Sequence, residues 1–89
     1  MTFDFGSMVV ILKNVTTIQV SVSEESSNDY SEADIKKIRE NVEAGNSLSS
    51  YKFYITINGI TTHIGTDAKE LLDLYDTFMD ALKLEQLDL

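Results

Sequence analysis

Several residue types that carry chemistry are missing or nearly missing from this chain. It has no cysteine and only one histidine, His63, among its 89 residues. The absence of cysteine excludes disulfide bonds, a thiolate nucleophile and cysteine-ligated zinc. A catalytic histidine needs an orienting acid and a nucleophile nearby, and the neighbours that we expect for His63 are Tyr54, Thr56 and Thr61. We therefore expect no enzyme activity, no catalytic residue, no metal site and no cofactor.

The chain also lacks proline and long apolar runs. Its turns must therefore depend on Gly, Asn and Ser. The longest apolar run covers residues 8–12, whereas a membrane-spanning helix needs roughly 20 apolar residues. No segment resembles a signal peptide. These observations predict a cytoplasmic protein without membrane contact.

Features of nucleic-acid and nucleotide binding are absent as well. The four glycines are scattered, so they form no phosphate-binding loop, and the seven basic residues are dispersed. The group Lys36, Lys37 and Arg39 follows an acidic segment, which we expect it to neutralise. We therefore expect no direct binding to nucleic acid.

Negative charge is what the sequence has in excess, and this charge is local. Fifteen acidic residues against seven basic ones give a net charge of −8. Five of the acids lie in residues 24–34, which contain no base, and seven lie in residues 67–89, which contain two bases. Because local charge selects partners and does not set the fold, this pattern predicts a basic protein partner.

Hydrophobic periodicity predicts two pairs of strands. Residues 8–12 are continuously apolar and residues 16–23 alternate between apolar and polar, so we expect a hairpin, with a single bent strand as the alternative. Asn58-Gly59 lies between two alternating segments in residues 51–64, which predicts a type I′ turn. A two-residue turn fixes the register of this second hairpin, in which Ile57 faces Ile60, Tyr54 faces His63 and Phe53 faces Ile64.

Each pair of strands is followed by a predicted helix. The first has Ser31 as its N-cap with Asp34 completing a capping box, and it runs to about residue 44, where Gly45 ends it. The second begins after Thr66 or Asp67. It carries the main apolar stripe, which consists of Leu71, Leu72, Tyr75, Phe78, Met79 and Leu82.

Together these elements predict an α+β fold in the order ββαββα. We expect a four-stranded, mainly antiparallel sheet with two helices packed on one face. Residues 8–89 form a single small domain. Residues 1–7 are expected to be a flexible arm, an edge strand or, because Gly6-Ser7-Met8 resembles a cloning junction, residues left from cloning.

One candidate partner-binding site is an acidic row on the second helix. Asp73, Asp76 and Asp80 recur at spacings of three and four residues, which places them on one helical face. Such a row is compatible with a solvated surface, with a partner-binding face or with a hard cation. A straight helix presents these carboxylates side by side and does not wrap them around an ion, so the partner-binding face is the functional hypothesis.

The acidic segment at residues 24–34 offers a second candidate, with Glu24, Glu25 and Asp29 as its partner-binding residues. It either keeps a loop soluble or joins the Asp73 row in a carboxylate pattern that mimics DNA phosphates. In size and acidity the chain resembles the small proteins that phages and mobile elements use against restriction or CRISPR nucleases. The leading hypothesis is therefore a non-enzymatic inhibitor that blocks the nucleic-acid-binding site of a basic enzyme.

A second hypothesis of a different class is a homodimeric structural or assembly module. Leu84, Leu87 and Leu89 extend past the core stripe, and two helices on one face of the sheet leave the other face uncovered. Exposed apolar patches often mark interfaces. The open sheet face and the C-terminal leucines are thus the expected sites of self-association.

Overall fold

The computed structural model describes residues 1–24, 26, 29, 31–46 and 51–87. In chain order, the elements are β1 (Thr2–Asp4), β2 (Val9–Ile11), the short 3-10 helix η1 (Leu12–Asn14), β3 (Ile18–Glu24), β4 (Ser31–Glu32), α1 (Ile35–Glu43), β5 (Tyr51–Ile57), β6 (Ile60–Gly65) and α2 (Ala68–Leu87). Within the described part of the chain, no helix is long and apolar enough to cross a membrane.

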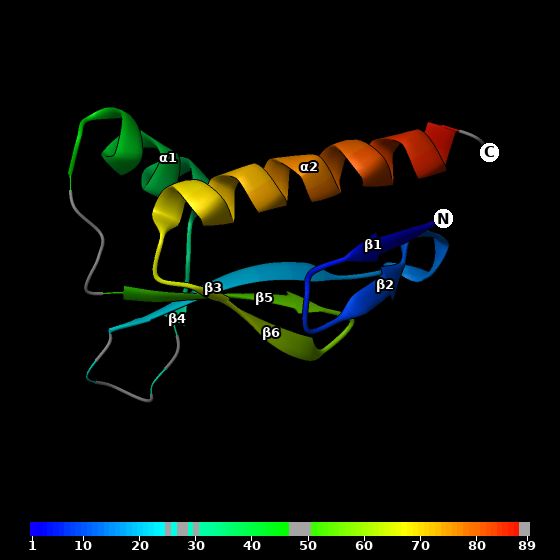
Figure 1. The fold of residues 1–89 in the computed structure, drawn as a ribbon, viewed down its shortest axis with the longest axis horizontal. Coiled ribbons are helices and arrows are strands. Elements are labelled where there is room, and N and C mark those ends of the chain that lie inside the picture. Colours follow the sequence, from blue (N-terminus) through cyan, green and yellow to red (C-terminus); the bar gives the residue numbers. More distant parts are fainter. Residues whose placement is uncertain (25, 27–28, 30, 47–50, 88–89) are drawn as a thin grey trace.

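The predicted α+β class is confirmed. Four antiparallel strands form one sheet in the order β4-β3-β5-β6, and β1 and β2 form a separate two-stranded hairpin. Both helices lie over the same face of the sheet, and α2 runs along its length (Figure 1). Among the described residues, no helix lies over the opposite face of the sheet.

The β5–β6 hairpin is the element that the sequence predicts best. Asn58 and Gly59 have positive φ angles of 52° and 84°, as a type I′ turn requires. Ile57 pairs with Ile60 as expected. A register shift between Phe53 and Tyr54 then pairs Phe53 with Gly65, so the predicted pairing of Phe53 with Ile64 is wrong. A β-bulge of this kind inserts one extra residue and displaces every later pair.

The predicted hairpin between residues 8–12 and 16–23 is also wrong. β2 pairs with β1, and β3 pairs with β5 instead. Leu12 starts the short helix η1, where its side chain is buried and its N–H donates to the Met1 carbonyl. This turn separates the two apolar segments, so they enter different sheets.

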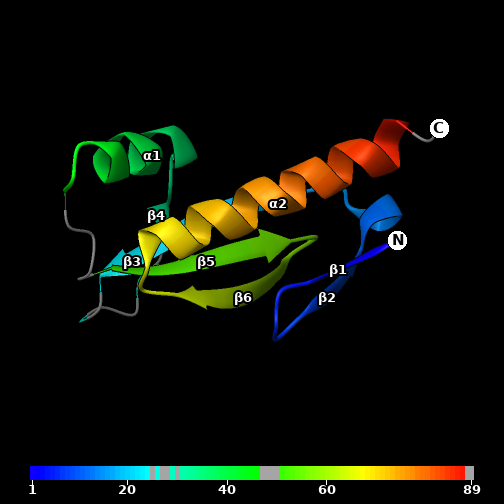
Figure 2. The ribbon, with the colours of Figure 1, turned by 45° about the horizontal axis from the view of Figure 1, so that its top comes forward.

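The first seven residues take part in the core through two phenylalanines. The rings of Phe3 and Phe5 lie 5.3 and 5.1 Å from the ring of Phe78, which is fully buried in α2. Tilted and edge-on aromatic contacts at these distances add to the hydrophobic gain of burial. The β1–β2 hairpin therefore closes the core beneath the second half of α2 (Figure 2).

The start of α1 differs from the prediction. The N-cap is Asp34, whose carboxylate accepts a hydrogen bond from the Lys36 N–H at 2.9 Å. Ser31, the expected cap, belongs to the two-residue strand β4, because β3 pairs with this segment before the helix begins. The helix ends at Glu43, and Gly45 follows with a φ of +78°, as the sequence predicts.

The side chain of Asn58 has a role that the turn pattern does not reveal. Its Oδ1 accepts hydrogen bonds from the backbone N–H groups of Thr16 and Thr17 at 2.8 and 3.2 Å. Its Nδ2 donates to the Asn14 carbonyl at 2.8 Å. One turn residue thus ties the β5–β6 hairpin to the segment between η1 and β3.

Candidate protein-binding surface

The outer face of α2 is set by the residues that the helix buries. Leu71 and Phe78 are fully buried, and Leu72 and Leu82 are nearly so. With 3.6 residues per turn, burial of this stripe turns Asp73 and Asp80 toward solvent. Both aspartates are exposed. The buried stripe that the sequence predicts thus determines which carboxylates are available to a partner.

The helix begins with a cap that adds to the negative charge of this face. The Asp67 carboxylate accepts hydrogen bonds from the N–H groups of Lys69 and Glu70 at 2.9 and 3.4 Å. Asp67 is one of the two predicted caps, and its charge suits the positive end of the helix dipole. Asp67 and Glu70 therefore extend the acidic surface toward the start of α2.

Asp73 and Asp80 form the part of the predicted row that remains available. Their carboxylates have no hydrogen bond or ion pair with any residue that the structure describes. The Thr77 hydroxyl, which lies between them on the helix, donates to the Asp73 backbone carbonyl at 2.8 Å. The hydroxyl is thus turned back onto the helix, and the carboxylates dominate this face.

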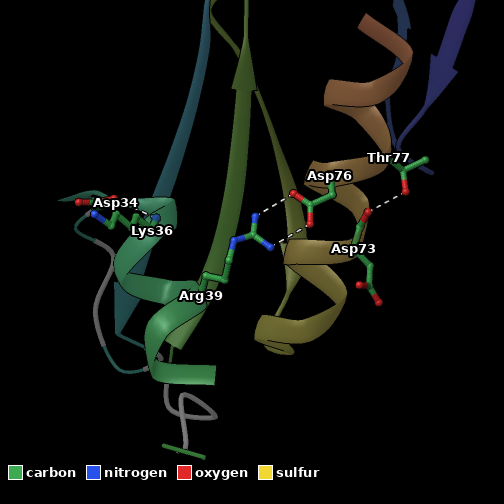
Figure 3. Close-up of polar contacts among 6 residues, drawn as sticks. All are labelled: Asp34, Lys36, Arg39, Asp73, Asp76 and Thr77. Atoms are coloured by element: carbon green, nitrogen blue, oxygen red, sulfur yellow. Dashed lines mark hydrogen bonds and ion pairs between the residues drawn. The ribbon is translucent and has the colours of Figure 1, made fainter. Parts of the chain in front are cut away.

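Asp76 behaves differently, because it forms a two-pronged ion pair with Arg39 of α1. The Arg39 nitrogens lie 2.9 and 2.8 Å from the two Asp76 carboxylate oxygens. Figure 3 shows Asp76 turned toward α1 and Asp73 turned away from it. The expectation that Arg39 neutralises the acidic segment at residues 24–34 is therefore wrong, since its guanidinium binds a carboxylate of α2.

This ion pair changes the protonation of both partners. The hydrogen bond from Arg39 lowers the pKa of the Asp76 carboxyl, and the Asp76 carboxylate raises the pKa of Arg39. Bidentate arginine–carboxylate pairs fix geometry as well as charge. Asp76 therefore links α1 to α2, and its charge is compensated within the fold.

A shallow hollow of about 520 Å³ adjoins the acidic face of α2. Its lining consists of Asp67, Lys69, Glu70, Asp73, Leu74 and Thr77. The three carboxylates outnumber the single lysine, and Leu74 supplies an apolar wall. Such a lining suits a lysine or arginine side chain, whose charged group needs carboxylates and whose aliphatic stem packs on apolar surface.

The second predicted site lies in a different place. Glu24 ends β3, and with Asp29 it lines a separate hollow of about 240 Å³ that also includes Tyr51. This hollow shares no lining residue with the one beside Asp73. Glu25, the third residue predicted here, lies outside the described residues. The structure therefore does not bring the two acidic segments together in one hollow.

The open face of the sheet is polar. Tyr54 and His63 are paired across β5 and β6, as predicted, with ring centroids 5.1 Å apart. On the next rung the hydroxyl groups of Thr56 and Thr61 are hydrogen-bonded at 2.8 Å. These are the pairs predicted for the uncovered face, and self-association through it would therefore join polar and aromatic side chains.

The C-terminal leucines are only partly described. Leu84 is exposed on the outer side of α2. Leu87 is the last residue of the helix, and the structure describes its backbone alone. Leu89 lies outside the described residues. Among the described residues, no three acidic or histidine side chains are grouped in a way that could hold a metal ion.

Comparisons of the chain with protein-family models, with curated proteins and with solved structures gave no match. The function must therefore be inferred from the surface itself. The acidic face of α2, which we define as Asp67, Glu70, Asp73 and Asp80, is the candidate site that the geometry describes best.

Proposed function

We propose that this chain is a non-enzymatic domain that binds a basic protein through the acidic face of α2. The observation that carries the proposal is the pair Asp73 and Asp80, two exposed carboxylates that make no ion pair among the described residues. Carboxylates presented in this way attract a positively charged groove and accelerate its association. The partner is therefore recognised first by its charge.

The spacing of the two carboxylates suits a surface that normally binds nucleic acid. Seven residues of helix advance about 10.5 Å at about 1.5 Å per residue. Three nucleotides of one DNA strand advance about 10.2 Å at about 3.4 Å each. In its most specific form, the domain is an inhibitor that occupies the nucleic-acid-binding site of a basic enzyme. The restriction and CRISPR nucleases are the class that the chain's size and acidity suggest.

The ion pair between Arg39 and Asp76 supports this surface without being part of it. It joins α1 to the flank of α2 next to Asp73 (Figure 3). A helix held by both the core and a neighbouring helix presents its outer carboxylates in a fixed arrangement. A pre-organised charge pattern loses less conformational entropy when a partner binds.

The proposal is tested by affinity capture of the tagged protein from a cell lysate at low and at high salt. We expect recovery of a basic nucleic-acid enzyme that elutes with salt, because exposed charge interactions are screened. Added DNA or RNA should compete with the capture, since both ligands would occupy one groove. Capture that survives high salt and an excess of nucleic acid would contradict the proposal.

A further inference from the structure

The outer edge of β6 differs from the rest of the surface because it carries no formal charge. Residues 53–66 contain no Asp, Glu, Lys or Arg, although the chain has 22 such residues. β6 is the last strand of the sheet, and no strand among the described residues pairs with its outer side. It therefore presents a free strand edge on an uncharged part of an acidic molecule.

Strand edges of this kind are usually protected against pairing with another chain. The common devices are charged side chains, proline, an edge bulge or a covering element. β6 contains neither a charge nor a proline, and the one irregularity of its ladder lies at Phe53/Tyr54, far from the turn. The strand from Ile60 to Ile64 thus has no charge, proline or bulge of its own, and the contact that the β1–β2 hairpin makes with it is through the side chain of Thr62.

The turn determines which backbone groups of β6 face outward. The Asn58 N–H donates to the Thr17 carbonyl, which lies on the β3 side of β5. Hydrogen-bonding direction alternates along an antiparallel strand, so Ile57 points toward β6 and bonds to Ile60. On β6 the same alternation directs the N–H and C=O groups of Thr61 and His63 away from the sheet.

These outward groups have a self-complementary arrangement. If two β6 strands are antiparallel and centred on Thr62, Thr61 of each copy lies opposite His63 of the other, in a hydrogen-bonded pair. The same register places Ile60 of each copy opposite Ile64 of the other, on the helix side of the sheet. A two-fold symmetric contact requires this reciprocity of residues.

An exposed apolar side chain lies on this strand, since Ile60 is 63% exposed. The β1–β2 hairpin lies next to β6, because the Ser7 hydroxyl is hydrogen-bonded to the Thr62 hydroxyl. The edge thus combines unpaired backbone groups with apolar surface whose burial favours association.

We propose that this protein forms a homodimer through the outer edge of β6, with two antiparallel copies of the strand joining two sheets. The occupant is a second copy because this register sets the exposed Ile60 of each copy against Ile64 of the other, so that each copy supplies both halves of the apolar contact. In addition, two molecules with a net charge of −8 repel each other least where the surface is uncharged. The proposal is independent of the acidic face of α2, and it places the interface at a different site from the two expected ones, the open sheet face and the C-terminal leucines.

The test is sedimentation equilibrium of the untagged protein over about a hundredfold range of concentration. We expect reversible dimerisation that persists or strengthens in high salt. Ile60→Lys should weaken the dimer about tenfold or more, because it places a charge in the apolar contact. Leu84→Lys is the matched control, since Leu84 is 59% exposed on α2 and the charge change is identical. This control should leave the dimer unchanged.

Amide hydrogen exchange provides a test on the unmodified protein, in which no substitution can disturb the fold. The N–H groups of Thr61 and His63 should become protected as the protein concentration rises. Those of Ile60 and Thr62 should be protected at all concentrations, because they bond to β5. A protein that stays monomeric while the amides of Thr61 and His63 exchange freely would overturn the proposal. The edge would then be available for pairing with a strand of another protein. Equal loss of the dimer in Ile60→Lys and Leu84→Lys would also overturn it.

Discussion

The acidic face of α2 and the outer edge of β6 are both exposed, yet they offer a partner opposite chemistry. Asp73 and Asp80 present charge on a helix whose backbone hydrogen bonds are satisfied within the helix. β6 presents unpaired backbone groups and Ile60, with no charged residue between Phe53 and Thr66. The comparison shows that one small domain can separate charge-driven recognition from strand pairing by placing each on a different element.

The two surfaces nevertheless depend on the same core. The buried side of α2 contributes Leu71 and Phe78, and the sheet contributes Phe53, Ile55 and Ile57. The β1–β2 hairpin completes this core through Phe5 and Val10. Variants should therefore fall into two kinds, those that remove both surfaces together and those that change one alone.

The largest effect is expected for Phe78→Ala, which should impair both surfaces at once. Its ring is fully buried and contacts Phe3 and Phe5, so its removal should lower the free energy of unfolding by about 3 to 5 kcal/mol. Urea denaturation followed by circular dichroism measures this loss. Leu84→Ala on the exposed side should stay within about 0.5 kcal/mol of the parent. Similar losses for both variants would contradict this account of the core.

A smaller effect is expected for Asn58→Ala, which acts on the β5–β6 hairpin and not on α2. Alanine loses the hydrogen bonds to Thr16, Thr17 and Asn14 and must also adopt a positive φ. The expected loss is about 1 to 3 kcal/mol. Asn58→Gly keeps the backbone conformation and loses only the hydrogen bonds, so its loss should be smaller. An Asn58→Ala protein as stable as the parent in urea would refute the role assigned to this side chain.

Salt should separate the two surfaces without any substitution. The screening length is about 10 Å at 0.1 M salt, so capture of a basic partner should fall steadily as salt rises. Dimerisation through β6 should not fall, because salt does not screen strand pairing or apolar burial. Salt does screen the charge repulsion between the two acidic copies. Parallel capture and sedimentation measurements over one salt series make the comparison. If both associations weaken together, the two surfaces are not chemically distinct.

The smallest effect on stability is expected for Arg39→Gln. The ion pair holds the pKa of Asp76 below its ordinary value, so it stabilises the fold above the pKa of a free aspartate. That contribution is lost as the pH falls through the lowered pKa of the folded state. In Arg39→Gln the pKa of Asp76 should return toward its ordinary value, which an NMR titration of its carboxyl carbon detects. An unchanged pKa would contradict the assigned cause.

Arg39→Gln should also strengthen binding of a basic partner, because Asp76 then joins Asp73 and Asp80 as an uncompensated carboxylate. Asp76→Asn is the matched control, since it breaks the same ion pair without freeing a carboxylate. Capture assays with the two variants distinguish the added charge from a loosened contact between α1 and α2. Equal capture by both would show that Asp76 does not contribute.

Local chemistry explains which parts of the fold could be predicted. The Asn58-Gly59 turn, the cap at Asp67 and the buried stripe of α2 each depend on residues close together in the sequence. The sequence predicted the turn and the stripe, and it narrowed the cap to Thr66 or Asp67. Strand pairing depends on distant residues. Nothing near Val10 indicates that it pairs with Phe3 and not with β3.

The candidate site shows the same division. Helical spacing placed Asp73, Asp76 and Asp80 on one face of α2, and of these Asp73 and Asp80 are exposed while Asp76 turns toward α1. It could not show that Asp76 binds Arg39, which is 37 residues away in the sequence. The ability of Ser31 to pair as a strand is likewise hidden from a pattern that favours it as a helix cap.

The central claim is that the acidic face of α2 recognises a basic partner, and matched charge reversals test it most directly. Capture of the basic partner by Asp73→Lys/Asp80→Lys should be compared with capture by Glu40→Lys/Glu43→Lys. Glu40 and Glu43 are exposed on α1, so both variants shift the net charge equally. The account predicts that the α2 variant loses the partner while folded and that the α1 variant retains it. Equal retention or equal loss would show that net charge, and not this face, determines binding.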